Sequence, residues 1–577
     1  MDKKTMALVA ALGVLIFFYF DIMESLGLYS PAKTPVVEQV VDTTQTSSQT
    51  QYSADSQPNQ SLEPTATTDV TQDNVVIQAD SIQQNIVNDT VIIETNKYIV
   101  KLTTFGGGPV SLLLKDYTYR NGELIEMIPN AKFATPTLSF AGGTYNTSQT
   151  TFTSTLQPGT YDATSGEISV TYQYVKEDGS AIKKHYHFFP NRYDYELDIE
   201  LVDPQKMGLT GKYTLIWNTP LGVTEPQPQA DYKAMDALTY QGGSLEKLND
   251  FEDKKLKQSL DGNTEWAGVR SKYFSAVLIP KNRNADAVSA NGVINTVTTK
   301  DGMLDERLIT VGLDMPFANV VSMTDSFTVF VGPLDYNMMA DYNENLEKIM
   351  NIGTTPFVGW IIKIFAVPIM WLLPKMYEFV PNYGLVIILF AFFVKIVTLP
   401  LSMKSFKSMN AMKVVQPQLE EVKKKYGKDP QRMQKETMKL YKEHGVNPIS
   451  GCLPMLPQMP LFFALFAVFR STILLRDAPF VWFINDLSRG ASSYTDPYMF
   501  LVLIMVTAQF FSQKLTMGAS TQQNKAIGYI MPLFMGWAFH SFASGLVLYW
   551  TCFSVFSLLD YVLFKRKELK NTNVKTA

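Results

Sequence analysis

The sequence contains few of the residues that build metal centres and disulfide frameworks. Its 577 residues include only two cysteines, Cys452 and Cys552, and four histidines. A structural zinc site needs several closely spaced Cys or His ligands, and a disulfide framework needs paired cysteines in an oxidising compartment. Because both cysteines lie in apolar segments, we expect neither arrangement, and we expect no metal or other cofactor.

Charged residues are also scarce. Asp, Glu, Lys and Arg make up 18% of the chain, below the roughly 25% that is typical of soluble domains. Hydrophobic residues make up 46%, and the net charge of −4 is too small to indicate a partner by its sign. A chain of this length exceeds a single core, so at least two domains are expected. The composition predicts an integral membrane protein with one large water-soluble domain.

The N-terminal residues predict a membrane anchor followed by a tether. "MDKK" precedes the apolar run "TMALVAALGVLIFFYF", and no convincing small-x-small cleavage site follows. Residues 1–22 are therefore interpreted as an uncleaved signal anchor with a cytoplasmic N-terminus, the alternative being a cleaved signal peptide. Residues 23–74 are rich in Thr, Gln, Ser and Pro, and they are predicted to form a disordered linker outside the cytoplasm.

Residues 75–335 consist of short stretches in which apolar and polar residues alternate, such as "GEISVTYQYV" and "DYELDIELVD". This period of two predicts antiparallel β-structure, most simply a large all-β sandwich. His185 and His187 would share one strand face, and without a further ligand nearby they are interpreted as exposed or cross-strand imidazoles rather than a metal pair. We expect this domain to act as a binding or spacer module.

The charge pattern of the last third predicts its membrane topology. Eleven Lys and Arg residues lie between Met403 and Cys452, so residues 403–451 are predicted to form a cytoplasmic helical hairpin, broken at "YGKDP". An odd number of crossings must separate the outer domain from this hairpin. Residues 357–379 are therefore predicted to lie along the membrane surface as an amphipathic interfacial helix, and residues 384–402 to span.

The remaining apolar segments predict four more spans, which gives an α-helical bundle of six transmembrane helices including the N-terminal anchor. These four spans are predicted at residues 452–475, 497–513, 526–542 and 545–564, followed by a cytoplasmic tail at 565–577. Several of the apolar runs are short, about 22 Å as helix, and the bilayer would have to thin around them.

Lys395 lies inside the predicted span at 384–402. A cation at the centre of a spanning helix costs roughly 2.5–3.5 kcal/mol. Lys404, nine residues further along the chain, is about 13 Å away along a helix. Both snorkelling of the side chain to the cytoplasmic surface and a wet cavity inside the bundle are consistent with this position. Asp560, near the inner end of the last span, is interpreted as pairing with the "KRK" that follows it.

Three motifs in the last third, "NPISGCLPMLPQMP", "LLRDAPFVWFINDLS" and "SGLVLYW", closely resemble the YidC family of membrane protein insertases. This family is related to the mitochondrial Oxa and chloroplast Alb insertases. The likeness covers residues 357–565, and "FGGGPV" resembles a double-glycine segment near the start of the periplasmic domain of the Gram-negative form. The resemblance implies a multi-pass protein of the inner membrane that inserts and helps to fold integral membrane proteins, alone or with the Sec translocon, and that is not an enzyme.

The resemblance also implies a site. Members of the family have a hydrophilic groove that carries one positive charge, usually an arginine, and Lys395 stands at the matching position. Lysine retains the charge but lacks the planar fork of arginine. The candidate groove residues are Lys395, Gln458, Gln509, Tyr549 and Trp550. The candidate residues of the hairpin for first contact with an incoming chain are Met409, Met412, Met433 and Met438, because methionine adapts to many apolar partners.

The expected partners are nascent membrane proteins and the lipid bilayer, with the Sec translocon and the ribosome as further candidates and no direct binding of nucleic acid. Two other function classes stay open. A secondary transporter or channel also uses intramembrane ionisable residues, although no internal repeat is visible here. A structural assembly factor of the cell envelope would place the function in the β-domain.

Overall fold

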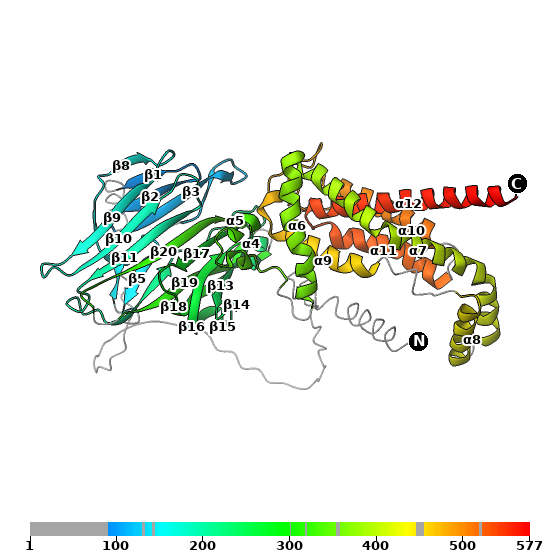
Figure 1. The fold of residues 1–577 in the computed structure, drawn as a ribbon, viewed down its shortest axis with the longest axis horizontal. Coiled ribbons are helices and arrows are strands. Elements are labelled where there is room, and N and C mark those ends of the chain that lie inside the picture. Colours follow the sequence, from blue (N-terminus) through cyan, green and yellow to red (C-terminus); the bar gives the residue numbers. More distant parts are fainter. Residues whose placement is uncertain are drawn as a thin grey trace, which may run out of the picture. The chain divides into compact units, whose positions relative to one another are not determined.

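The computed structural model describes most of the chain after residue 89. The described residues are 90–129, 133–140, 143, 145–299, 302–317, 320–353, 358–427, 429–445, 455–517 and 522–576. The predicted signal anchor at 1–22 and linker at 23–74 lie outside the described residues. Strands occupy the first part of the described chain and helices the last part (Figure 1).

Two β-sheets form the domain that the alternating sequence predicts. The smaller sheet has five strands in the order β4-β3-β2-β1-β8. Strand β1 pairs antiparallel with β2 and parallel with β8. The bounds are β1 (Val91–Glu94), β2 (Tyr98–Thr103), β3 (Gly108–Thr118), β4 (Leu124–Glu126) and β8 (Gly159–Asp162).

The larger sheet has fifteen strands, with the path β6-β5-β12-β19-β18-β16-β17-β20-β11-β10-β9-β7 and with β13, β14 and β15 attached beside β16. The bounds are β5 (Thr137–Phe140), β6 (Tyr145–Asn146), β7 (Thr153–Ser154), β9 (Ile168–Val175), β10 (Ala181–Phe188), β11 (Asp194–Val202), β12 (Gly211–Trp217), β13 (Asp236–Gln241), β14 (Ser244–Leu248), β15 (Phe251–Glu252), β16 (Lys255–Arg270), β17 (Phe274–Pro280), β18 (Ala285–Thr299), β19 (Gly302–Phe317) and β20 (Ser322–Pro333).

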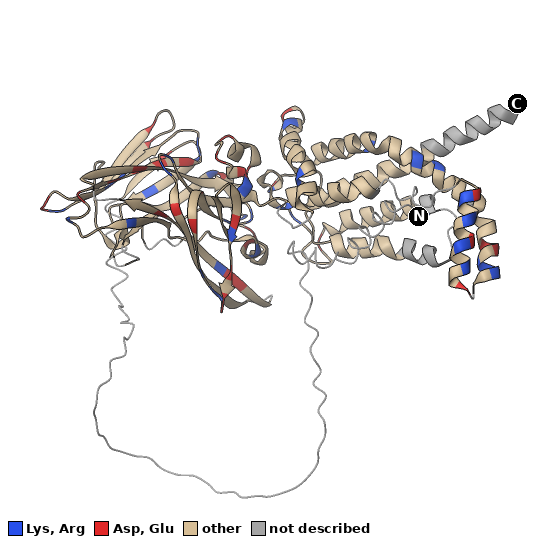
Figure 2. Cartoon of the chain, turned by 60° about the horizontal axis from the view of Figure 1, so that its bottom comes forward, with Lys and Arg blue, Asp and Glu red and all other residues tan. Residues whose placement is uncertain are grey.

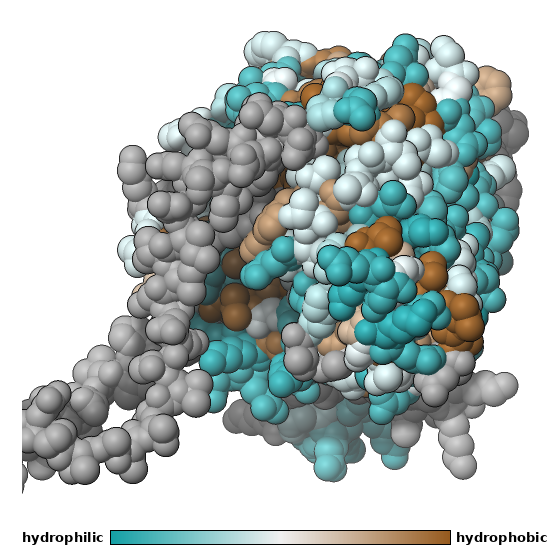
Figure 3. All heavy atoms as spheres, turned by 90° about the vertical axis from the view of Figure 1, so that its left-hand side faces the viewer, coloured by the Kyte–Doolittle hydropathy of each residue, from teal (hydrophilic) through white to brown (hydrophobic). Residues whose placement is uncertain are grey.

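The two sheets pack as a sandwich around aromatic side chains. Buried and partly exposed residues alternate along β11, as a half-buried strand requires. The Tyr98 hydroxyl of the smaller sheet donates a 3.2 Å hydrogen bond to the Asp194 carbonyl of the larger one. His185 and His187 lie on one face of β10 and contact Thr171 and Ser169 of β9, as cross-strand imidazoles do. Contrary to the expectation that no further ligand lies nearby, Glu200 lies 3.2 Å from His185 and Glu167 3.3 Å from His187. The face of the domain in Figure 3 is mainly hydrophilic, with small separated hydrophobic areas.

A glycine segment and a buried lysine join the two sheets. Gly106 and Gly107 adopt positive φ angles of 85° and 62° just before β3. The Lys184 ammonium of β10 donates hydrogen bonds to the Gly106 carbonyl at 2.8 Å and the Pro136 carbonyl at 3.3 Å. A Cβ atom on Gly107 would lie 2.7 Å from the Phe152 ring, so the close packing here requires glycine.

The helical elements follow the sandwich or connect its strands. Their bounds are η2 (Thr147–Gln149), α4 (Pro228–Ala234), α5 (Tyr336–Ala340), η3 (Leu346–Met350), α6 (Gly359–Phe379), α7 (Tyr383–Tyr426), α8 (Pro430–Glu443), α9 (Met455–Ser471), η5 (Ile473–Leu475), α10 (Met499–Met517), α11 (Gln522–Phe539) and α12 (Ser544–Thr576). Among the described residues, three helical stretches are long and apolar enough to cross a membrane: Gly359–Phe379, Tyr383–Met412 and Ser544–Val562. Shorter apolar stretches lie at Leu456–Ser471, Met499–Lys514 and Ile530–Phe539.

Helix α6 carries an exposed apolar face. Trp360, Ile364, Val367 and Trp371 recur at helical spacing and are all exposed. The length and hydropathy of α6 would also allow it to cross a membrane. Its predicted position along the membrane surface therefore stays a prediction that rests on the charge of the following hairpin.

Helix α7 continues without a break from the predicted span into the hairpin that is predicted to be cytoplasmic. It has 44 residues, so the predicted boundary at residue 402 falls inside one helix. Pro400 and Pro417 lie within it, and Gly427 follows its last residue. Helix α8 then begins at Pro430 with Asp429 as its N-cap, so the two helices separate at the predicted break. Figure 2 shows that Lys, Arg, Asp and Glu gather on this hairpin and are sparse on the apolar helices.

Ion pairs connect the β-domain to the loop between α9 and α10. The Arg476 Nε atom lies 2.7 Å from the Glu225 Oε1 atom, and both side chains are more than nine-tenths buried. The Arg120 Nη2 atom lies 2.6 Å from the Asp486 Oδ2 atom. These contacts place the loop against the sandwich, on the side of the helices that the charge pattern assigns to the outside.

Candidate functional site: a polar cluster between α7 and α12

Lys395 is buried between two apolar helices. Its side chain is only 7% exposed, and its Nζ atom lies 3.0 Å from the Asp560 Oδ2 atom of α12. The same ammonium donates a 3.0 Å hydrogen bond to the Ser557 hydroxyl. It also lies 4.8 Å from the centre of the Phe553 ring, in a cation–π arrangement. Lys395 therefore has three partners, all on α12.

The sequence of α12 explains why these partners converge. Phe553, Ser557 and Asp560 follow one another at intervals of four and three residues, which places them on one helix face. Phe390 of α7 packs against Tyr549, one turn before Phe553, with ring centres 6.1 Å apart. Since contacts advance along both helices in the same direction, α7 and α12 run parallel, and Lys395 meets this face of α12.

The Lys395–Asp560 contact is an ion pair that lacks hydrogen-bond geometry. The Asp560 Oδ2 atom is buried and accepts no hydrogen bond from the described residues. The Asp560 side chain is 15% exposed, about twice the value for Lys395. The Ser557 hydroxyl, in contrast, donates to the Phe553 carbonyl at 2.8 Å while it accepts from Lys395. The lysine is thus fixed by the serine and the ring as well as by the acid.

A second polar contact joins two of the other predicted residues. The Trp550 Nε1 atom donates a 3.3 Å hydrogen bond to the Gln509 Oε1 atom of α10. The Trp550 ring packs edge-on against Phe462 of α9 and Phe539 of α11. Trp550 therefore lies where four helices meet, and on α12 it precedes Ser557 by seven residues, about two helical turns.

Tyr549 and Gln458 are placed differently. Tyr549 is 1% exposed, and its hydroxyl has no hydrogen-bond partner among the described residues. The Tyr549 ring packs against the Phe553 ring, with ring centres 6.0 Å apart. Phe553 is the ring that contacts the Lys395 ammonium. Gln458 is partly exposed on α9, and the described residues form no hydrogen bond with it. The structure thus brings Gln509 and Trp550 into contact and Tyr549 near Lys395, but it does not join Gln458 to them.

The acid is the main residue whose role the sequence analysis missed. Asp560 was expected to pair with the basic tail, whose side chains lie outside those that the structure describes, and the structure places Lys395 3.0 Å from it. A signal was present, because Lys395 is the one charged residue between Tyr383 and Met403, and Asp560 is the one charged residue between Ser544 and Phe564. A single cation and a single anion in two apolar helices are expected to form an ion pair, because opposite charges attract strongly in a medium of low dielectric constant.

The four methionines of the hairpin are partly exposed. Met409 and Met412 lie on the second half of α7, and Met433 and Met438 lie on α8. None is fully buried and none is fully exposed. Each therefore retains some apolar surface for a further contact.

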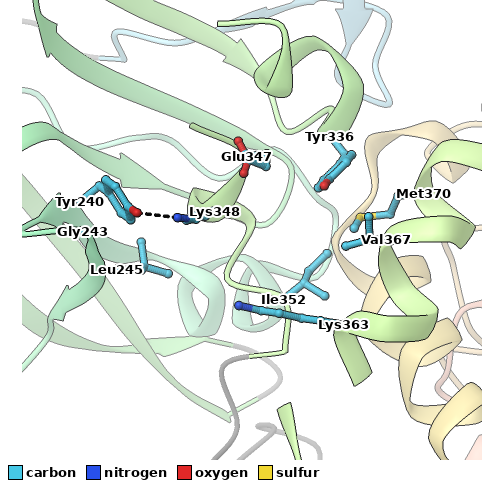
Figure 4. Close-up of a pocket in the computed structure, with 10 residues that line it drawn as sticks. All are labelled: Tyr240, Gly243, Leu245, Tyr336, Glu347, Lys348, Ile352, Lys363, Val367 and Met370. Carbon is cyan, nitrogen blue, oxygen red and sulfur yellow. Dashed lines mark hydrogen bonds between the residues drawn. The ribbon is translucent and has the colours of Figure 1, made fainter. Parts of the chain in front are cut away.

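A cavity of about 300 Å³ lies away from this cluster. It is lined by residues of β13, the β13–β14 hairpin, the segment from α5 to η3 and α6 (Figure 4). Lys348 donates a 2.6 Å hydrogen bond to the Tyr240 hydroxyl within it. None of the candidate groove residues lines this cavity.

Two family models together cover almost all of the described chain. Residues 90–372 match the model of the YidC periplasmic domain, and residues 375–571 match the model of the 60Kd inner membrane protein. The membrane protein insertase YidC of Chloroherpeton thalassium is 35% identical, and the match covers 81% of this chain and 81% of the relative. The chain belongs to the YidC family of membrane protein insertases.

A second curated relative gives the same family. The YidC insertase of Chlorobaculum tepidum is 35% identical over 81% of this chain and 80% of its own length. Among solved structures, an active YidC insertase with its first transmembrane domain resolved is 20% identical and covers 82% of this chain and 95% of its own, with a TM-score of 0.34. The β-sandwich is thus the periplasmic domain of an inner membrane protein, and the apolar helices belong to the part named as the 60Kd inner membrane protein.

Proposed function

We propose that this YidC protein inserts and helps to fold integral membrane proteins in the inner membrane, and that Lys395 marks the groove that receives their hydrophilic segments. The observation that carries the site is the buried contact of Lys395 with Asp560 and Ser557 between apolar helices. Ionisable groups within membrane-spanning helices are costly, and they usually face a bundle interior or a wet cavity. A polar lining at this depth suits a hydrophilic segment in transit.

The mechanism follows from the cost of moving a hydrophilic segment across about 30 Å of hydrocarbon. A polar site part-way across replaces some of the water that the segment loses, so it lowers the barrier without covalent chemistry. The polar side chains of Lys395, Gln458, Gln509, Tyr549 and Trp550 are the proposed lining. The apolar span of the substrate would then leave sideways along the apolar surfaces of α9 and α11.

The short helices support the same proposal. The apolar runs Tyr498–Ser512 and Ile527–Phe542, of 15 and 16 residues, are shorter than the roughly 20 residues that span an ordinary bilayer. If these stretches cross, the membrane around them must thin, which shortens the path of the substrate. The proposed topology has six spans with cytoplasmic termini, with α6 on the outer surface and the hairpin of α7 and α8 in the cytoplasm.

The hairpin methionines are the proposed first contact with the incoming apolar segment, because they retain accessible apolar surface among cations. The proposed partners are nascent membrane proteins, with the Sec translocon and the ribosome as candidates. The relatives are named as insertases, and we propose that this chain likewise performs no covalent reaction.

A secondary transporter or channel is the alternative function, and the Lys395–Asp560 pair is the observation that favours it. Intramembrane acid–base pairs also serve proton and ion pathways. Proteoliposomes separate the two functions. An insertase makes a membrane protein resistant to external protease without changing the pH or the ion content inside the liposomes. A transporter changes the internal pH or ion content even when no substrate protein is present.

Site-specific crosslinking to a stalled nascent membrane protein tests the proposed site. A photoreactive amino acid at Lys395 or at Gln458 should capture the hydrophilic segment of the substrate. Val397, which is 63% exposed on α7, and Leu559, which is 53% exposed on α12, serve as matched control positions. Equal capture of the hydrophilic segment from all four positions, or equal capture of a stalled soluble protein, would contradict the groove.

A further inference from the structure

The buried acid changes the electrostatics of the proposed groove. If Lys395 were alone, its charge would attract acidic groups of a substrate and repel basic ones. In the structure the Asp560 carboxylate lies 3.0 Å away, so the two charges largely cancel at any larger distance. An incoming carboxylate can pair fully with Lys395 only if Asp560 moves aside.

The surroundings of the pair offer few other charges. The apolar parts of α9 and α10, which pack with α12, each contain a single charged residue, and both lie near a helix end: Arg470 on α9 and Lys514 on α10. On α7 the next cation after Lys395 is Lys404, and on α12 the next cations after Asp560 are Lys565, Arg566 and Lys567. Within this region a substrate therefore meets one buried cation and one buried anion, side by side.

Lys395 and Asp560 differ in how many further contacts their side chains make. When Asp560 moves, Lys395 keeps its hydrogen bond to Ser557 and its contact with the Phe553 ring. Asp560 has no such second contact, because its Oδ2 atom accepts no hydrogen bond from the described residues and its side chain is the more exposed of the two. The acid is thus the partner that can leave at the lower cost.

We infer that Asp560 is the exchangeable counterion of Lys395 and determines which charges the groove accepts. A substrate segment with an acidic side chain replaces Asp560 on the lysine, and a segment with a basic side chain pairs with the released aspartate. The resting pair shields both charges from lipid until a substrate arrives. This inference rests on the proposed insertase function, and it assigns Asp560 as a specificity-determining residue.

Charge-matched substrates test the inference in proteoliposomes that contain the full-length chain. The substrate is a single-span protein whose translocated tail carries two Asp, two Asn or two Lys residues at the same positions. Insertion of the acidic and basic forms is expressed relative to the neutral form, which removes differences in the amount of folded insertase. We expect D560N to raise the acidic-to-basic ratio by about five- to tenfold, because one partly shielded charge interaction is changed.

Three further variants separate specificity from a purely structural role. K395Q should shift the ratio in the opposite direction, D560E should restore it, and the double variant K395Q/D560N should insert acidic and basic tails less well than neutral ones. If D560N does not fold, the double variant, which leaves no uncompensated charge, still tests the inference. A structural role for Asp560 would lower the insertion of all three tails equally and leave the ratios at the wild-type value.

The outcomes distinguish the inference from the function on which it rests. If the wild-type chain inserts no tail above the level of empty liposomes, the proposed function is wrong and the inference is wrong with it. If the wild-type chain is active and the ratios do not change in D560N or in the double variant, the inference alone is overturned.

Discussion

Two lysines are buried in the part of the chain that the structure describes, and their surroundings differ. Lys395, between α7 and α12, has an acid within 3.0 Å. Lys184, in the periplasmic domain, is wholly buried and has two backbone carbonyls and the Phe152 ring as partners. A carboxylate compensates a buried ammonium far better than carbonyl dipoles do. Lys395 is therefore the partner of a charge, whereas Lys184 serves as a cross-link between strands.

The Lys395–Asp560 pair predicts a strong energetic coupling. K395M leaves a buried carboxylate without a counterion, and D560N leaves a buried ammonium, so each is expected to destabilise the helical region by about 3–5 kcal/mol. The double variant K395M/D560N buries no charge and should lose less stability than the sum of the two. Thermal unfolding in detergent, arranged as a double-mutant cycle, measures the coupling. Additive losses would show that the pair does not interact.

Because Lys184 is buried, we expect the stability of the periplasmic domain to depend on pH above neutrality. Burial lowers the pKa of Lys184 from 10.5 to about 7. Between these values the unfolded chain binds a proton that the folded domain does not. The periplasmic domain should therefore lose stability as the pH falls from about 10 to 7, by up to about 1.4 kcal/mol per pH unit, and should change little below 7 from this cause.

Hydrogen exchange of the β10 amides in the full-length protein, expressed as a free energy of opening, measures this dependence. K184M, which keeps most of the side-chain volume and carries no charge, is the control, and it should flatten the profile between pH 7 and 9. An identical slope in the wild type and K184M would assign the dependence to other groups.

At the scale of single elements, the glycine segment before β3 shows how one turn fixes the packing of two sheets. Gly107 has a positive φ of 62°, and a Cβ atom built on it would lie 2.7 Å from the Phe152 ring. Gly122 has a similar φ of 86°, but no atom lies within 4 Å of the position where a Cβ would be built. A side chain at Gly122 would therefore add backbone strain alone, whereas a side chain at Gly107 would add both backbone strain and steric overlap.

Alanine at these two positions should have different effects. G122A adds backbone strain alone and is expected to cost about 1 kcal/mol. G107A adds the same strain and also pushes against Phe152, which should cost a further 1–3 kcal/mol or so. Thermal unfolding followed by the near-ultraviolet signal of the domain compares them. Equal destabilisation would show that the Phe152 side chain moves away freely.

Some elements could be predicted from the sequence, and others could not. The alternation in "DYELDIELVD" predicts β11, and "YGKDP" predicts the end of α7, because both signals are local. The pairing of β1 with β8, parallel and distant in sequence, has no local signal. Lys395 and Ser557 are likewise 162 residues apart, and their contact depends on the rotation of two helices about their axes, which apolar sequences do not specify.

At the scale of the whole molecule, the periplasmic domain and the helices are joined by buried ion pairs. Glu225 of the domain holds Arg476 of the loop that follows α9 and η5, and burial raises the pKa of the Glu225 carboxyl while the nearby arginine opposes that shift. The pair lies on the opposite side of the helical region from the cytoplasmic hairpin in the proposed topology. The domain thus contacts the outer loop rather than the Lys395 cluster.

Deleting residues 75–330 should leave most membrane insertion intact, because none of the candidate groove residues lies in the deleted part. Arg476 and Asp486 would lose their partners Glu225 and Arg120, but they would then be solvated and should cost little stability. Insertion of a single-span substrate by proteoliposomes measures the outcome. Loss of all insertion by a correctly folded deletion variant would favour an assembly factor whose function resides in the periplasmic domain.

The uninterrupted course of α7 has a mechanical consequence. From Lys395 to the tip of the hairpin at Tyr426, the helix extends for about 45 Å as a single rod. A rod of this length acts as a lever, and a tilt of about 10° at Lys395 moves the tip by about 8 Å. Any load on the tip therefore exerts a torque on the segment that carries Lys395, with Pro400 and Pro417 as the positions where a proline-containing helix yields first.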